Sequence, residues 1–188
     1  YNTRKFHEAL EYGNSLIQKF PHAAVLYRIM GTIHASLNDF PQAILKYEQC
    51  LQLNKDDIDC INNLSFAQRK LGKREEALRN LTKAIALRSD YAPFHSDQGS
   101  LLEGLSQYDN ALVSYKRAIL LNPGAAIPYT YLSSVLADLE KSDYSLRNYI
   151  RAQKIIPTEA SIYFNIGIFT NFSRDHLDYH KSIKEYFL

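Results

Sequence analysis

The sequence predicts an all-α fold in which one helix pair is repeated along the chain. Small residues recur every 34 residues in two parallel series, Gly31, Ser65, Gly99, Ser133 and Gly167 in the first and Ala9, Ala43, Ala77, Ala111 and Ser145 in the second. A fixed period of this length indicates one small structural unit repeated in line. Apolar residues spaced by three and four favour helices, and the sequence carries no strand signal of matching strength.

The first helix of each unit is predicted from the residues on one helical face. If slots are counted from the first residue of a unit, units begin at Ala24, Ile58, Ala92, Ala126 and Ala160. Slot four holds a large residue in each unit, namely Tyr27, Ile61, His95, Tyr129 and Tyr163. Slot seven is mostly apolar, and the Gly or Ser at slot eight lets another helix come close.

A turn and a second helix complete the unit. Asn38, Gly72 and Ser106 lie in the predicted turns, because these residue types tolerate left-handed backbone or bond their own backbone. The second helix carries the small residue of slot 20 and mostly Tyr at slot 24, and it ends near Leu53, Leu87 and Leu121. Proline at slot 32 cannot continue a helix and marks the link to the next unit, at Pro21, Pro123 and Pro157.

This pattern resembles the tetratricopeptide repeat family. The third unit shows the resemblance best, with Gly99, Leu105, Tyr108, Ala111, Tyr115, Ala118 and Pro123 in place. The resemblance covers almost the whole chain and implies a right-handed superhelical solenoid of antiparallel helix pairs. It divides a single array, 1–188, into the second helix of a partial repeat (1–23), four complete repeats (24–57, 58–91, 92–125 and 126–159) and a fifth, divergent and incomplete repeat (160–188).

The two ends of the array lack the polar capping helix that a solenoid needs. We therefore expect the native protein to continue beyond Leu188 and before Tyr1, and self-association through the uncapped terminal repeats is the alternative. The chain begins without Met or a leader, so we interpret it as a fragment. Its localisation stays open, with the cytoplasm favoured.

Composition argues against several function classes. A net charge of +2 is too small to indicate nucleic acid as a partner, and no stretch of 18 apolar residues exists to span a membrane. Cys50 and Cys60 make no disulfide framework and are expected to be small buried side chains. No phosphate-binding loop or nucleophile elbow is present, so we expect no catalytic residue and no cofactor here. His176, Asp178 and His180 lack a further ligand, so no metal is expected.

The family resemblance implies where a partner binds. In this family the first helix of each pair lines a concave groove, with slots 2, 5, 9 and 12 pointing into it. The groove residues predicted in this way are Arg28, Thr32, Asn62, Phe66, Arg69, Ser96, Ser100, Thr130, Ser134, Phe164 and Ile168. Arg28, Asn62 and Arg69 suit a peptide backbone or a carboxylate, and Phe66 suits an aromatic anchor. The alternative is that several of these positions pack against an adjoining repeat or domain.

Two hypotheses of function follow. The first is a protein–protein interaction scaffold that binds a peptide or a partner helix in the groove. The second is the substrate-recruiting arm of a larger enzyme, a glycosyl-, sulfo- or methyltransferase, whose catalytic domain lies outside this chain; whether the full-length protein is an enzyme stays open. Slot six reads Asn63 and Asn165 in two of five units, similar to the Asn ladder of repeats attached to the O-linked N-acetylglucosamine transferase. Slots five and nine do not match the branch that clamps acidic chaperone tails.

Overall fold

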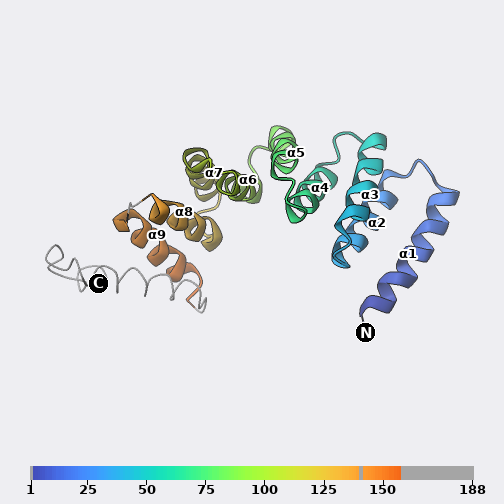
Figure 1. The fold of residues 1–188 in the computed structure, drawn as a ribbon, viewed down its shortest axis with the longest axis horizontal. Helices are drawn as coiled ribbons and strands as arrows, with labels where there is room; N and C mark the ends of the chain where they lie inside the picture. Colours follow the sequence, from blue (N-terminus) through green and yellow to red (C-terminus); the bar gives the residue numbers. More distant parts are fainter. Residues whose placement is uncertain (1, 140–141, 158–188) are drawn as a thin grey trace, which may run out of the picture. The chain divides into compact units, whose positions relative to one another are not determined.

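The protein is described by a computed structural model for residues 2–139 and 142–157. Within these ranges every regular element is an α-helix (Figure 1). The helices are α1 (Asn2–Lys19), α2 (Ala24–Ser36), α3 (Phe40–Leu53), α4 (Ile58–Lys70), α5 (Arg74–Leu87), α6 (Ala92–Gly104), α7 (Tyr108–Leu121), α8 (Ala126–Asp138) and α9 (Ser142–Ile155). The predicted all-α helical-repeat class is confirmed. The predicted fifth repeat, 160–188, lies outside the described residues.

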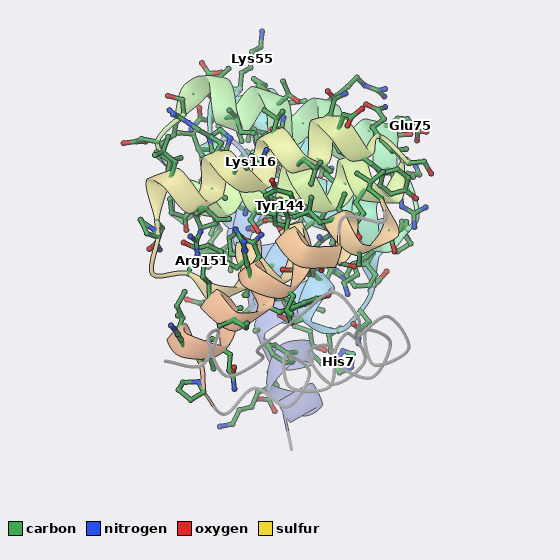
Figure 2. All side chains as sticks on the ribbon, turned by 90° about the vertical axis from the view of Figure 1, so that its left-hand side faces the viewer. His7, Lys55, Glu75, Lys116, Tyr144 and Arg151 are labelled. Carbon is green, nitrogen blue, oxygen red and sulfur yellow. The ribbon has the colours of Figure 1, made fainter. Side chains whose placement is uncertain are left out.

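The helices fall into two compact units, Tyr1–Ser114 and Tyr115–Leu188. In the first unit each helix from α1 to α5 packs against the next one along the chain, and α2 also contacts α4. In the second unit α8 packs against α9. Charged side chains such as Lys55 and Glu75 project away from the helices of the first unit (Figure 2).

Local sequence signals begin the helices and shape the turns between them. The carboxylates of Asp39 and Asp57 cap α3 and α4 by accepting hydrogen bonds from the backbone N–H of Gln42 at 3.4 Å and Cys60 at 2.9 Å. The turns inside the first three pairs each place slot 15 in the left-handed region, at Asn38 (φ 60°), Gly72 (φ 77°) and Ser106 (φ 59°). Residues that tolerate this conformation therefore recur at the same slot, as the sequence predicts.

Small side chains lie where the two helices of a pair meet. Slots 20 and 27 are fully buried, at Ala43, Ala77, Ala111 and Ser145 and at Cys50, Ala84, Ala118 and Ala152. At slot eight, a Cβ added to Gly31 would lie only 2.6 Å from the Cε1 atom of Tyr47, the residue at slot 24 of the same unit. The 34-residue period therefore records a close contact between helices that larger side chains would prevent.

Two of the Ser residues that replace Gly or Ala in this contact, Ser65 and Ser145, bridge the two helices of their pair through the hydroxyl. Ser65 of α4 donates a hydrogen bond to the carbonyl oxygen of Ala77 in α5 at 2.8 Å. In the second unit the roles are reversed, and Ser145 of α9 donates to the carbonyl oxygen of Ser133 in α8 at 2.8 Å. Both residues are buried, and the hydroxyl of each has a hydrogen-bond partner. Replacing Gly or Ala by Ser at these two positions therefore leaves neither hydroxyl unsatisfied.

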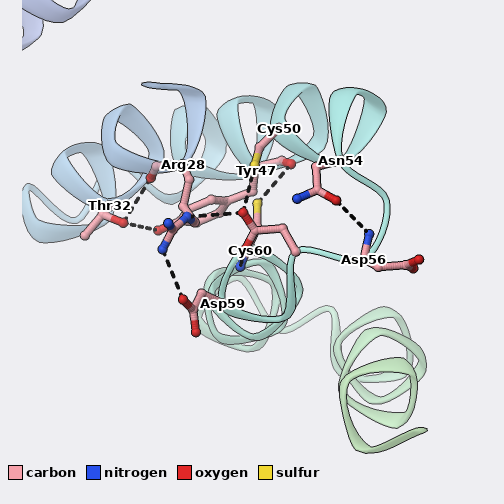
Figure 3. Close-up of polar contacts among 9 residues, drawn as sticks. Arg28, Thr32, Tyr47, Cys50, Asn54, Asp56, Asp59 and Cys60 are labelled. Atoms are coloured by element: carbon pink, nitrogen blue, oxygen red, sulfur yellow. Dashed lines mark hydrogen bonds and ion pairs between the residues drawn. The ribbon is translucent and has the colours of Figure 1, made fainter. Parts of the chain in front are cut away.

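The two cysteines are free and fully buried, as the sequence predicts. The Sγ of Cys60 donates to the carbonyl oxygen of Tyr47 at 3.3 Å, and the Sγ of Cys50 lies 3.8 Å from a carboxylate oxygen of Asp57 (Figure 3). Burial raises the pKa of both thiols, which keeps them in the unreactive neutral form. Among the described residues, no helix combines the length and apolar character needed to cross a bilayer.

Replacing Gly31 tests the close approach of α2 and α3. We expect Gly31→Val to lower the free energy of unfolding by about 1–3 kcal/mol, because the added methyls meet the buried Tyr47 ring. Urea denaturation followed by circular dichroism measures the change. Gly104→Ala is the control, because an added Cβ there meets only the flexible side chain of Arg74. Equal stability of Gly31→Val and the wild type would contradict the contact.

Candidate functional site

A cavity of about 150 Å³ lies between the first helices of the second and third repeats. Its lining residues come from α4, α5 and α6 and are Asn62, Asn63, Ser65, Phe66, Arg69, Leu81, Asp97 and Leu101. Asn62, Phe66 and Arg69 follow one another at intervals of four and three residues, so they share one face of α4. The cavity therefore brings together three of the residues predicted to line a groove.

The inner part of the cavity is apolar, and two amides stand in its wall. The side chains of Leu81 and Leu101 are almost fully buried. Asn62 and Asn63 are half-buried, and their side-chain amides make no hydrogen bond within the part of the chain that is described. Each amide carries both donors and an acceptor. The two amides are thus available to a polar group that enters the cavity.

Phe66 forms an aromatic wall that remains 42% exposed. Its ring meets the ring of Phe40 edge to face, with 6.3 Å between the ring centroids. The guanidinium carbon of Arg69 lies 5.6 Å from the Phe66 centroid, and the ammonium nitrogen of Lys70 lies 5.4 Å from it. The ring is therefore partly open to solvent and already makes cation–π contacts with two residues of its own helix.

Asp97 of α6 faces Arg69 of α4 across the cavity. The Nη1 atom of Arg69 lies 3.7 Å from the Oδ1 atom of Asp97 and donates a hydrogen bond of 3.4 Å to the hydroxyl of Ser100. The Asp97 carboxylate has no hydrogen bond within the described residues. Burial raises its pKa, and the charge of Arg69 offsets this only in part. Within the described residues Arg69 is thus the one cation paired with Asp97, and solvent reaches the 48% of the side chain that is exposed.

Arg28 and Thr32 occupy slots five and nine of α2, the slots that Asn62 and Phe66 occupy in α4. Both are held by contacts within the chain. The Nε of Arg28 lies 3.3 Å from Asp57 and its Nη1 lies 3.2 Å from Asp59 (Figure 3). Thr32 donates to the carbonyl oxygen of Arg28 at 3.0 Å and accepts from the hydroxyl of Tyr47 at 3.4 Å. Arg28 thus links α2 to the start of α4, a structural role that the sequence did not reveal.

The other predicted groove residues differ in accessibility. Ser96 is buried. Ser100 touches Arg69 at the cavity, whereas Thr130 and Ser134 are half-buried residues of the second unit. Phe164 and Ile168, like His176, Asp178 and His180, lie outside the described residues. No cluster of three potential metal ligands occurs in 2–139 or 142–157.

Asn63 and Asp97 were not among the predicted groove residues. Both occupy slot six, one position beyond the slot-five residues that the family pattern assigns to the groove. The series of slot-six residues was a usable signal, because it is polar in both of the repeats that form the cavity. The structure shows that slots five and six share this site.

Comparison with family models identifies repeats over residues 26–124. Models described as "Tetratricopeptide repeat" match residues 26–60, 58–91 and 92–124, which together cover more than half of the chain. A model described as "Mur ligase middle domain" matches residues 150–188, of which the structure describes only 150–157.

Similar curated proteins are much longer than this chain. Anaphase-promoting complex subunit 3 of Schizosaccharomyces pombe is 22% identical over 87% of this chain and 25% of its own length. A UDP-N-acetylglucosamine–peptide N-acetylglucosaminyltransferase of Giardia intestinalis is 26% identical over 88% of this chain and 12% of its own length. The chain thus spans a quarter or less of these relatives.

Similar solved structures share the fold. MamA superposes with a TM-score of 0.79 at 18% identity, covering 85% of this chain and 94% of that one. YrrB, described as a TPR protein with an unusual peptide-binding site, superposes with a TM-score of 0.72 at 19% identity, covering 88% of this chain and 85% of that one. Likeness at this identity concerns the fold alone.

The stabilities of Arg28→Ala and Arg69→Ala test whether Arg28 contributes more to the fold than Arg69 does. We expect Arg28→Ala to lower the free energy of unfolding by about 1–2 kcal/mol, because Asp57 is mostly buried and loses its cation. Arg69→Ala should cost less than about 1 kcal/mol, because its ion pair with Asp97 is long and partly exposed. Chemical denaturation compares the two variants. Equal losses would show that Arg69 is as structural as Arg28.

Asp97→Asn tests whether the ionised carboxylate of Asp97 destabilises the fold. Because the pKa of Asp97 is raised, its ionised form is disfavoured in the fold, and stability falls as pH rises through that pKa. We therefore expect the variant to have an equal or higher Tm than the wild type at neutral pH, with any gain vanishing in acid. Thermal melts at several pH values measure this. A clearly lower Tm at neutral pH would show that the Asp97 charge stabilises the fold.

Proposed function

This chain belongs to the tetratricopeptide repeat family, a family of protein-interaction scaffolds, and from that premise we propose that it binds a peptide segment of a partner protein at the α4–α6 cavity. The fold typically carries no catalytic site. The observation that supports the proposal is the pair of amides of Asn62 and Asn63, which have no hydrogen-bond partner among the described residues and lie beside the exposed ring of Phe66.

The chemistry of these groups suits an extended peptide. A side-chain amide can donate to a backbone carbonyl and accept from a backbone N–H at the same time. Each such hydrogen bond contributes about 0.5–1.5 kcal/mol net, and an exposed aromatic ring adds an apolar contact that can dominate binding. Of the remaining predicted groove residues, Ser100 on α6 accepts a hydrogen bond from Arg69 and extends the proposed surface within the first unit.

A second candidate function is recruitment of a substrate to a larger enzyme. It is supported by the similarity to the Giardia transferase and by Asn63 at slot six, where the related ladder of Asn residues lies. In this proposal the same cavity holds a protein substrate, and a transferase domain is encoded in the same gene. Sequencing the complete gene separates the two candidates, since a catalytic domain supports recruitment and its absence contradicts it.

Selection of peptides tests the binding proposal. We expect a display library of random dodecapeptides to yield sequences that bind the chain and bind Phe66→Ala or Asn63→Ala at least about tenfold more weakly, as for the loss of a central contact. Fluorescence anisotropy with synthetic peptides measures the affinities. Leu45→Ala is the control, because Leu45 is an exposed apolar residue outside the cavity. Peptides that bind all four proteins equally would contradict the proposed site.

A further inference from the structure

We propose that the α4–α6 cavity selects a basic side chain, lysine or arginine, of the bound peptide. This inference rests on the peptide-binding function proposed above and specifies the residue that enters the cavity. Its basis is the arrangement of Asp97, the two amides and the Phe66 ring around one apolar interior.

Asp97 supplies the main interaction. Its carboxylate lines the cavity, has no hydrogen bond within the described residues and has one ion-pair partner there, Arg69 at 3.7 Å. A group in this state gains most from a second cation that also donates a hydrogen bond. The raised pKa of Asp97 reflects its burial, which the charge of Arg69 offsets only in part.

The other groups of the cavity complete a site for a cation. The amide oxygens of Asn62 and Asn63 are acceptors for additional N–H donors of an ammonium or a guanidinium group. The face of the Phe66 ring attracts cations, and Leu81 and Leu101 suit the methylene groups of a long basic side chain. A basic side chain thus finds both polar and apolar partners in this cavity.

An acidic side chain fits less well, although Arg69 and Lys70 are near. It would place a second negative charge in the cavity that Asp97 already lines. Arg69 is already engaged with Asp97, Ser100 and the Phe66 ring. Lys70 is exposed and has no ion pair within the described residues, so its ammonium group can move into solvent when another cation arrives.

Peptides from the random display library provide the test. We expect the peptides enriched on the wild-type chain to share a lysine or arginine at one position. Replacing that residue by Gln should weaken binding at least about tenfold, the size expected for a charge-assisted hydrogen bond. Asp97→Asn should weaken binding of the basic peptide by a similar factor and leave the Gln peptide unaffected. Asp138→Asn, an exposed aspartate outside the cavity, should change neither affinity.

Lys70→Gln separates the basic from the acidic alternative. Removing this competing cation should leave the affinity for the basic peptide equal or higher, whereas an acidic peptide would bind more weakly. Enriched peptides without a shared basic residue, or an unchanged affinity in Asp97→Asn, would overturn the inference and leave peptide binding intact. If no peptide is enriched, the proposed function fails together with the inference.

Discussion

Within the described residues, the helix pairs carry only Gly, Ala, Ser or Cys at slots 8, 20 and 27. In the four helix pairs that the structure describes, the residues at slots 20 and 27 are fully buried, and the ring of Tyr47 lies against Gly31. The hydroxyls of Ser65 and Ser145 each donate a hydrogen bond to a carbonyl oxygen of the facing helix. This contact fixes how the two helices of a pair pack. As a result, the same slots of the first helix face away from the second helix in each pair.

Side-chain contacts between the first helices of successive pairs determine which residues of that face remain accessible to a partner. Arg28 of α2 and Arg69 of α4 each reach a residue 31 positions further along, Asp59 and Ser100. Arg28 is held by the carboxylates of Asp57 and Asp59 at 3.2–3.3 Å, so it links α2 to the start of α4. Arg69 is held more loosely, and a cavity whose two amides have no partner among the described residues remains between α4 and α6. The candidate site thus lies beside Arg69, whose contacts are longer, and not beside the tightly paired Arg28.

Much of this organisation could be predicted from the sequence, because it depends on residues within one repeat. The period of Gly31, Ser65 and Gly99 fixes the helix pairs, and the helical spacing of Asn62, Phe66 and Arg69 places them on one face. The ion pairs of Arg28 and the role of Asp97 could not be predicted in this way. They depend on how long side chains cross from one repeat to the next, which the pattern of small and apolar residues does not specify.

Peptide binding at the cavity requires that the amides of Asn62 and Asn63, which have no partner among the described residues, form hydrogen bonds with the peptide. Their side-chain NH₂ signals in a ¹H–¹⁵N correlation spectrum report this directly when a binding peptide is added. We predict that both signals shift on addition, while the amide of Asn80, which already donates to Gln68 at 2.8 Å, keeps its position. Binding that leaves the Asn62 and Asn63 signals unchanged would show that the partner uses another surface.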